Sequence, residues 1–353
     1  MVTQVVRIQN DHIDEDALKK LKSAGEIIKN GGLVAFPTET VYGLGGDALN
    51  PGSSRKIYEA KGRPSDNPLI VHICCIEDMY KIADPVPEEA LVLAKHFWPG
   101  PLTMIMKKTA CVPMETTGGL DTVAVRMPDH EIARHLIRYG GGFVAAPSAN
   151  RSGRPSPTSA KYVIEDMDSK IDMIIDGELS GIGLESTIID LTVSPPQILR
   201  PGFITEEMLT QVLGEVSRDR TCFECDTELA PRAPGMKYRH YAPLGEMTIV
   251  EGEANQVIDY VNHMAEMNRE KGEKTGVIAS DETAAKYKAD VVKSAGSRTD
   301  EKEIGRRLYE ILRQFDEESV TVIYSESFFS EEGFSQAIMN RLLKAAGHRV
   351  IKL

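Results

Sequence analysis

The spacing of hydrophobic and polar positions changes repeatedly along the chain, and each change predicts a helix or a strand. In residues 16–30 the apolar positions recur at helical spacing. Residues 33–36 form a short apolar run directly after Gly31 and Gly32, which is typical of a buried strand that follows the end of a helix. The candidate core positions of this helix are Leu18, Leu21, Ile27 and Ile28.

The same alternation of apolar runs and amphipathic segments continues to residue 213. Asn50 and Pro51 predict a helix start, as a cap followed by proline at the first helical position, and this helix is expected to end at residues 61–63. Further strands are expected at residues 69–73, 102–107, 122–126, 143–146, 171–175, 186–191 and 197–199. Further helices are expected at residues 77–83, 88–98, 129–139, with Asp129 as its cap, and 205–213.

From Met247 onward the pattern is more regular, because strands and helices alternate one for one. Strands are expected at residues 247–250, 276–279, 290–292, 320–324 and 349–353. Helices are expected at residues 253–269, 300–315 and 333–345, with a short one from Asp281. Such alternation predicts a parallel sheet that helices cover on both faces, so the fold class is α/β.

The length of the chain changes this picture, because 353 residues favour two domains over one. We expect a first domain over residues 1–213, a linker over 214–245 and a second domain over 246–353. Residues 233–243 of the linker are dense in cations, aromatic residues and turn formers, whereas an ordinary linker is rich in Gly, Ser or Pro. We therefore expect this part of the linker to lie against another part of the protein.

Composition and charge exclude several classes of protein. No apolar run approaches the roughly 20 residues of a membrane helix, and the N-terminal residues lack the features of a secretory signal. Five cysteines, an odd number, fit a reducing compartment, so we expect a cytoplasmic protein without membrane attachment. The formal net charge of -12 argues against a protein that grips nucleic acid through its phosphates, and predicts weak or no direct binding of nucleic acid.

Several familiar site patterns are absent or weak. There is no Walker-type phosphate loop, and the glycines at 43, 45 and 46 are interpreted as a tight turn that needs positive φ. Cys222 and Cys225 have no second pair with which to hold zinc, so no protein-bound metal is expected. His72, taken alone, is more typical of a core histidine than of a ligand.

Polar clusters that follow the predicted strands carry the functional signal, since open α/β sheets bind ligands beyond the carboxyl ends of their strands. Together they combine hydroxyls, amides and cations, which favours a positive groove for a polyphosphate and a small zwitterion. No acidic residue recurs in them as an obvious general base, so positioning and charge stabilisation are the simplest chemistry. The clusters contain Thr38, Thr40, Lys61, Arg63, Asn67, His72, Arg126, Ser148, Asn150, Arg154, Ser156, Ser186, Thr187 and Arg200.

Segments that contain all of these residues except Arg126 resemble the L-threonylcarbamoyladenylate synthase family. The segments are FPTETVYGLG, KGRPSDNPLIVH, PSANRSGRPSPT, ESTIID and ILRPG. The segment PGMKYRHYAP, followed by an α/β domain, resembles the longer, two-domain form of that family. The resemblance covers nearly the whole chain. It implies a first domain with a twisted mixed α/β sheet and a large positive cavity, and a smaller Rossmann-like second domain.

The resemblance also implies a reaction and its partners. L-threonine, bicarbonate and ATP would form threonylcarbamoyl-AMP and pyrophosphate, with Mg²⁺ carried by the ATP. A separate transferase would then move the threonylcarbamoyl group to the adenosine beside the anticodon of tRNAs that read codons beginning with A. The resemblance places threonine contacts on Thr40, His72, Arg126, the backbone near Ala146, and Ser186.

ATP contacts are implied for a second set of residues, and Lys61 and Arg63 are the expected catalytic cations. This second set is Arg63, Asn67, Thr122, Ser148, Asn150, Ser156, Arg200, His240 and Tyr241. The linker residues Lys237, Arg239, His240 and Tyr241 are expected to form a lid that excludes water.

Three alternatives remain open from the sequence. One is a carbamoyl-adenylate former for metal-centre maturation, although its paired CxxC modules are missing here. Another is a double-stranded-RNA binding module, which the net charge of -12 opposes. The third is a sensor that binds threonine and a nucleotide without turnover, which pyrophosphate release would exclude.

Overall fold

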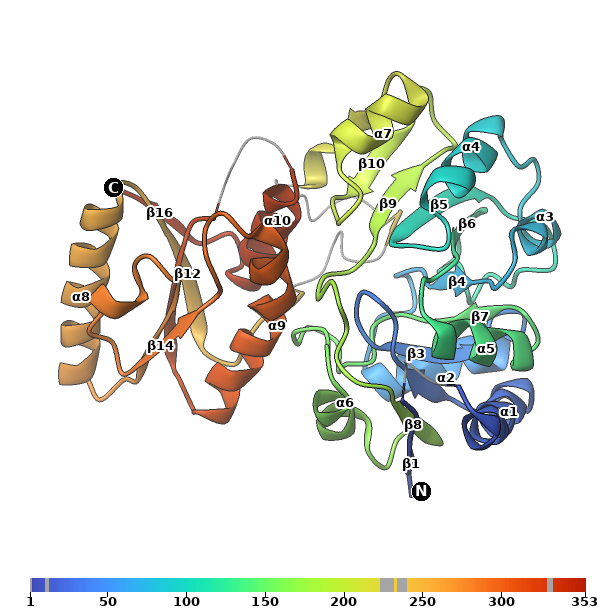
Figure 1. Ribbon diagram of the computed structural model, residues 1–353, viewed down its shortest axis with the longest axis horizontal. Helices are drawn as coiled ribbons and strands as arrows, with labels where there is room; N and C mark the ends of the chain where they lie inside the picture. Colours follow the sequence, from blue (N-terminus) through green and yellow to red (C-terminus); the bar gives the residue numbers. More distant parts are fainter. Residues whose placement is uncertain (1, 10–12, 223–231, 234–239, 329–332) are drawn as a thin grey trace. The chain divides into compact units, whose positions relative to one another are not determined.

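A computed structural model describes residues 2–9, 13–222, 232–233, 240–328 and 333–353 of the chain (Figure 1). The chain divides into two compact units. The first comprises Met1–Ser152 and Ser156–Lys237, and the second comprises Gly153–Pro155 and Tyr238–Leu353. A three-residue segment from the middle of the chain thus belongs to the second unit. The domain boundaries expected from the sequence stay predictions.

The first unit is built on an 11-stranded sheet that mixes parallel and antiparallel pairs, with the order β1-β8-β2-β3-β7-β4-β6-β5-β9-β10-β11. Its strands are β1 (Gln4–Arg7), β2 (Val34–Phe36), β3 (Gly43–Asp47), β4 (Ile70–His72), β5 (Leu102–Lys107), β6 (Thr122–Arg126), β7 (Val144–Ala145), β8 (Met173–Asp176), β9 (Thr187–Asp190), β10 (Gln197–Arg200) and β11 (Ser217–Arg218). The mixed α/β sheet expected for the first domain is therefore confirmed.

Helices cover the two faces of this sheet unequally. One face carries the main core, in which Ile57 of α2 and Leu93 of α4 meet strand residues such as Val125. On part of the other face, α1 and α5 pack together over β2 and β7. The helices of this unit are α1 (Glu15–Lys29), α2 (Pro51–Lys61), α3 (Met79–Ile82), α4 (Glu88–Phe97), α5 (Glu131–Tyr139), α6 (Ala160–Met167) and α7 (Glu206–Leu213).

The ends of α2 follow the local sequence rules closely. Asn50 caps the helix, because its side chain accepts a hydrogen bond of 2.8 Å from the N–H of Gly52. Gly62 ends it in the left-handed conformation, with a φ of 61°. In contrast, Asp129 does not cap α5, because the helix starts at Glu131 and His130 occupies the cap position without a side-chain hydrogen bond.

The glycine-rich stretch after Thr40 is a strand, so the turn predicted there is wrong. Gly43 and Gly45 lie in β3, which pairs antiparallel with β2, and no glycine of this strand has a positive φ. Their small size is the physical reason: a Cβ on Gly45 would lie 2.9 Å from both Phe36 and Val144. Because Gly45 has no Cβ, the side chains of Phe36 and Val144 can pack directly against the backbone of β3.

The second unit is a five-stranded sheet with the order β14-β13-β15-β12-β16, and every pair in it is parallel. The predicted parallel sheet is thus confirmed. Helix α8 packs on β13 and β15, whereas α10 packs on β12 and on α9. The elements are β12 (Glu246–Glu251), α8 (Ala254–Glu270), β13 (Thr275–Ala279), a 3-10 turn (Ala284–Lys286), β14 (Val291–Ser294), α9 (Glu301–Glu317), β15 (Val322–Glu326), α10 (Ser335–Ala345) and β16 (Val350–Lys352).

Within the described ranges, no helix combines the length and the hydropathy that a membrane span requires.

Candidate active site

The alternation of side chains along the central strands of the first unit places a row of polar residues on one face of the sheet. Val71 and Val125 point into the main core. Their neighbours His72 and Arg126 therefore lie on the opposite face, beyond the small apolar cluster that contains Ile70 and Ala124. Apolar packing against the main core thus fixes which face the polar row occupies.

Strand register brings the members of this row side by side. His72 on β4 is the parallel partner of Arg126 on β6, and Arg126 is the antiparallel partner of Thr103 on β5. The hydroxyls of Thr103 and Ser186 are 2.8 Å apart. Arg200 then donates through Nε to the carbonyl of Ser186 at 3.0 Å and through Nη2 to its hydroxyl at 3.2 Å.

Arg126 also contacts an acidic side chain. Its Nη2 lies 2.7 Å from Oε1 of Glu39, and the two side chains are 5% and 14% exposed. Glu39 lies between Thr38 and Thr40, whose hydroxyls are 2.9 Å apart. The loop after β2 thereby joins the polar row, with Thr40 fully buried next to the ion pair.

Two buried histidines near this ion pair are held neutral. Burial, together with the charge of Arg126, lowers the pKa of His72 to about 3. Burial also lowers the pKa of His130 to about 4, against the charge of Glu39, which acts in the opposite direction. At neutral pH both imidazoles are therefore uncharged, and the charges nearby are those of Arg126 and Glu39.

Lys61 and Arg63 lie at the end of α2, and both are buried. Nζ of Lys61 donates to the carbonyls of Ser148 and Asn150 at 2.5 and 2.6 Å. Arg63 donates to the carbonyls of Asn67 and Pro68. The sequence predicts these cations as ligand contacts next to a turn, and the structure adds that they hold two loops of the site in place.

Two further predicted nucleotide residues, Ser148 and Ser156, lie in the segment between β7 and α6. An isolated bridge joins Ser148 to Gly43 of β3, and Ser156 donates from its hydroxyl to Oε1 of the buried Glu185 at 2.5 Å. Thr122 starts β6, at the end of the strand opposite to Arg126, so no register contact joins it to the polar row. The backbone N–H of Ala146 donates to the carbonyl of Ile70, which places Ala146 close to His72.

His240 and Tyr241, the two ATP contacts predicted in the linker, belong to the second unit. The ring of Tyr241 lies 5.3 Å from that of Tyr309 on α9, and the guanidinium of Arg341 lies 5.7 Å from its centroid. His240 is also buried there. The expected lid residues Lys237 and Arg239 lie outside the described residues, so the lid stays a prediction.

Glu39 is the site residue that sequence reasoning missed. The sequence indicates no general base, because no acidic residue recurs in the polar clusters, and a single glutamate between two threonines does not stand out. Its partner Arg126 comes from a different predicted strand, so their pairing depends on the fold. A usable signal was its place in the loop directly after a buried strand, where ligand-binding residues gather.

A group of metal-type ligands lies elsewhere in the first unit. Ligand atoms of Cys74, Cys75 and Asp78 lie within 4.8 Å of one another. Cys75 donates from its thiol to Asp78 at 2.9 Å, and this hydrogen bond is the main reason why the pKa of the thiol is raised to about 11. A thiol held in its protonated form is a poor metal ligand, because metals bind the thiolate.

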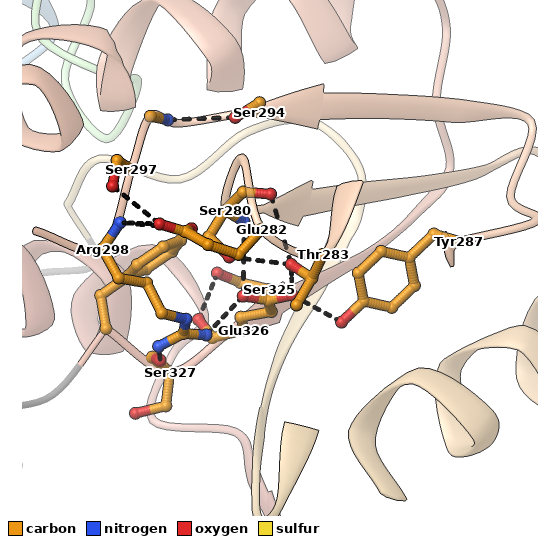
Figure 2. A network of polar contacts seen from close by, with 12 residues as sticks. Ser280, Glu282, Thr283, Tyr287, Ser294, Ser297, Arg298, Ser325, Glu326 and Ser327 are labelled. Carbon is orange, nitrogen blue, oxygen red and sulfur yellow. Dashed lines mark hydrogen bonds and ion pairs between the residues drawn. The ribbon is translucent and has the colours of Figure 1, made fainter. Parts of the chain in front are cut away.

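The second unit has its own polar cluster at the carboxyl ends of its strands. Figure 2 shows Thr283, Tyr287 and Arg298 converging on Glu326, which is 3% exposed. Glu326 and Arg298 also line a cavity of about 260 Å³ beside the start of α8. The contacts named here all join residues of the second unit.

The first unit thus gathers buried cations, hydroxyls and amides on one mixed α/β sheet. A family model described as "Telomere recombination" matches residues 26–202, and one described as "Threonylcarbamoyl-AMP synthase, C-terminal domain" matches residues 204–347. Relatives named threonylcarbamoyl-AMP synthase include one from Pyrococcus abyssi, 49% identical over 95% of this chain and 96% of the relative. Another, from Bacillus subtilis, is 46% identical over 94% of each chain.

A solved structure agrees with these relatives. The crystal structure of Pyrococcus abyssi Sua5 complexed with L-threonine matches with a TM-score of 0.92, 48% identity and full coverage of both chains. This chain therefore belongs to the threonylcarbamoyl-AMP synthase family. The family, fold class and enzyme class expected from the sequence are confirmed, which favours the synthase over the three alternatives.

Proposed function

We propose that this chain joins L-threonine, bicarbonate and ATP into L-threonylcarbamoyl-AMP and pyrophosphate, and that the polar row on the sheet of the first unit is where threonine binds. The single observation that supports the placement is the register that sets His72 beside Arg126 and links Arg126 through Thr103 to Ser186. The names of the relatives, and the complex of Pyrococcus abyssi Sua5 with L-threonine, support the substrate.

Each member of the row has a role that suits its chemistry. Arg126 would bind the carboxylate of threonine, since a guanidinium matches a carboxylate with two parallel donors. Thr40 and Ser186 would receive the side-chain hydroxyl, and the backbone near Ala146 would contact the amino-acid backbone. His72, which burial keeps neutral, would line the threonine site with a polar group that carries no positive charge.

ATP would bind along the loops that Lys61 and Arg63 hold. Their positive charges would offset the charge that develops on the phosphates as pyrophosphate leaves. Mg²⁺ carried by ATP would neutralise further phosphate charge when it is bound. The other proposed ATP contacts are Asn67, Thr122, Ser148, Asn150, Ser156, Arg200, His240 and Tyr241.

The order of events follows from the stability of the intermediate. A neutral threonine amine attacks bicarbonate or CO2, and the resulting carbamate is short-lived in water. A carbamate oxygen then attacks the α-phosphorus of ATP, so a P–O bond forms to the carbamate and the bond to pyrophosphate breaks. A closed and positively charged cavity would protect the carbamate until that step.

The linker and the hand-over complete the proposal. Residues 233–243 would cover the nucleotide and exclude water, with the second unit as their anchor, and cleavage near Arg232 by a protease should slow when ATP and threonine are both present. The product would pass, in the cytoplasm, to a transferase that modifies tRNA. Strong direct binding of tRNA is not expected, because the net charge of -12 opposes it.

One experiment tests the reaction. The protein is incubated with ATP, threonine and labelled bicarbonate, and the label is sought in an adenylate while pyrophosphate is measured. We expect one labelled adenylate for each pyrophosphate, and no pyrophosphate above background when threonine is omitted. Threonine binding without pyrophosphate release would instead identify a sensor, and tight tRNA binding with a steep salt dependence would identify an RNA-binding module.

A further inference from the structure

Glu39 is a buried carboxylate whose place in the site has no explanation in the roles given above. It lies in the loop between β2 and β3, and its side chain is 14% exposed. The loop backbone is fixed, because Ile182 donates its N–H to the carbonyl of Glu39 at 2.8 Å and Gly183 donates to that of Thr40 at 3.1 Å. The carboxylate is therefore held at one position beside Arg126.

The contact between Glu39 and Arg126 is close but poorly aligned. Oε1 and Nη2 are 2.7 Å apart, yet neither atom has a partner with hydrogen-bond geometry among the described residues. Oε2 of Glu39 is also shielded from solvent and accepts no hydrogen bond from them. Burial of a carboxylate oxygen without a donor costs free energy, so a group that supplies donors would be bound favourably there.

The described groups that face Glu39 are the guanidinium of Arg126 and the imidazole of His130. The pKa of His130 is lowered to about 4, so this imidazole is neutral at pH 7 and Arg126 is the charged partner of Glu39. His72 lies next to Arg126 on the neighbouring strand and is neutral for the same reason. Arg126 and Glu39 thus form a positive and a negative site side by side, which matches the two charges of a free amino acid.

We propose that Glu39 binds the ammonium group of L-threonine and then accepts a proton from it. This inference rests on the proposed function, since it assumes that threonine binds to the polar row. On binding, the carboxylate of threonine takes aligned hydrogen bonds from Arg126, and the ammonium group donates to the shielded oxygens of Glu39. The zwitterion thereby gives each member of the misaligned ion pair a better partner.

The proton transfer balances without any further reactant. The ammonium group gives one proton to Oε2 of Glu39, which leaves a neutral amine and a neutral carboxyl group. The amine nitrogen then forms a bond to the carbon of bicarbonate, and the products are the carbamate and water. Glu39 returns its proton to the solvent when the product leaves and the ion pair with Arg126 forms again.

Substitutions at Glu39 test the binding step. E39Q keeps the size of the side chain and removes its charge, and E39D keeps the charge on a shorter arm. Calorimetry compares threonine with 2,3-dihydroxybutanoate, in which a hydroxyl replaces the amine. The unsubstituted protein should prefer threonine, and E39Q should lose roughly 30-fold in threonine affinity while its affinity for the hydroxy acid changes little. E39D should lose less, and an unchanged preference for threonine in E39Q would overturn the proposal.

The pH profile tests the proton transfer. At pH 7 we expect E39Q to turn over roughly 100-fold more slowly than the unsubstituted protein. Because each pH unit below the pKa of the threonine amine changes the neutral fraction about tenfold, the deficit should shrink as the pH is raised from 7 to 9. A purely structural role would give a deficit that does not change with pH, and that result would overturn the base role.

A matched control separates these effects from a loss of stability. E326Q removes another buried carboxylate that pairs with an arginine, in the second unit. It should leave both the amine preference and the pH profile unchanged, and thermal unfolding measures the stability of each variant. If E39Q does not fold, the amine preference and pH profile of E39D decide the question, since its carboxylate sits farther from the amine. An unsubstituted protein that releases no pyrophosphate refutes the proposed function, whereas an active one with a normal E39Q refutes only this inference.

Discussion

Two buried carboxylates, one in each unit, differ in how well their oxygens are satisfied. Glu326 in the second unit receives hydrogen bonds from the hydroxyl of Tyr287 at 2.8 Å and the N–H of Ser280 at 3.3 Å, together with contacts from Thr283 and Arg298 (Figure 2). Glu39 in the first unit has one close but misaligned arginine. Both are largely buried, so burial alone does not distinguish them.

The difference shows which carboxylate is part of the framework and which is ready for a ligand. A fully satisfied buried charge adds rigidity, whereas an incompletely satisfied one costs stability unless another molecule completes it. The first unit tolerates that cost at the place where we propose that the zwitterion of threonine binds. Glu326 in the second unit does not carry that cost, because both of its oxygens have donors.

The largest effect is expected from the choice of amino acid. Serine lacks one methyl group of threonine and should lower kcat/KM by roughly 10-fold to 200-fold. Valine lacks the hydroxyl and leaves buried polar partners unpaired, so it should lower kcat/KM by roughly 1,000-fold or more. Pyrophosphate release with each amino acid measures both. Equal use of valine would mean that the polar row of the first unit is framework, like the Glu326 cluster.

The next largest effect on activity is expected from substitutions at Lys61 and Arg63. K61A or R63A should lower turnover by well over tenfold, because each removes a cation that we propose to offset charge on the phosphates. K61A should also lower the free energy of unfolding by about 1.5 to 3 kcal/mol, since two buried carbonyls lose a charged donor. Pyrophosphate release and urea unfolding measure the two effects.

Lys56 on the same helix provides the control for Lys61. Its Nζ donates to the carbonyl of Gly31 at 2.6 Å, but its side chain is exposed. K56A should therefore leave turnover unchanged and reduce stability only slightly. Near-normal turnover in both K61A and R63A would remove these two cations from the site.

A smaller effect, on the free energy of unfolding, is expected when the pH is lowered. The folded-state pKa values of His72 and His130, about 3 and about 4, lie below the unfolded value of roughly 6.5. The unfolded state therefore binds more protons below pH 6.5, and stability falls as the pH is lowered from 6.5 toward 4. Each histidine contributes at most about 1.4 kcal/mol per pH unit.

Urea unfolding at pH 7, 6 and 5 measures this loss. H72Q should show a shallower fall in unfolding free energy than the unsubstituted protein, because one of the two buried imidazoles is gone. H263Q, at an exposed histidine of the second unit, should show no change in slope. The same slope in H72Q and the unsubstituted protein would mean that His72 does not titrate as its burial indicates.

The smallest effect on activity is expected from E326Q. It should lower the free energy of unfolding by about 1 to 3 kcal/mol, because several buried donors lose their charged acceptor. Turnover and the KM for threonine should stay within about twofold of the unsubstituted protein, which an assay of pyrophosphate release checks. A large change in turnover or in the KM for threonine would show that Glu326 contributes to activity. The two carboxylates would then not differ in function as we expect.

The sequence predicted best the elements whose local pattern agrees with their packing. The strands expected at residues 102–107 and 122–126 have the same bounds in the structure, because apolar side chains and β-branched residues give a clear pattern there. Strand β3 was missed because glycine has low strand propensity, and only the packing of Phe36 and Val144 explains its presence. Helix α6 and strand β1 were also missed.

The site was predictable as a set of residues but not as an arrangement. The segments that resemble the family contain His72, Ser186 and Arg200, and the resemblance also implies a contact at Arg126. Only strand register and hydrogen bonds show that these residues are neighbours. Glu39 was missed because its significance depends on Arg126, which is far away in the sequence. The burial of Lys61 was missed for a similar reason, since the carbonyls that surround it come from a later loop.

The edge strand β1 has a consequence for how the chain is made. Among the described strands it pairs with β8 alone, and the hydroxyl of Thr3 reaches the carbonyl of Ile171, 168 residues further along the chain. On a ribosome that adds about 5–20 residues per second, the N-terminal strand waits roughly 8–34 s before its partner has been synthesised. During that time its backbone donors and acceptors are exposed to any other strand edge. A chaperone that binds short extended segments would therefore have its longest opportunity at Gln4–Arg7.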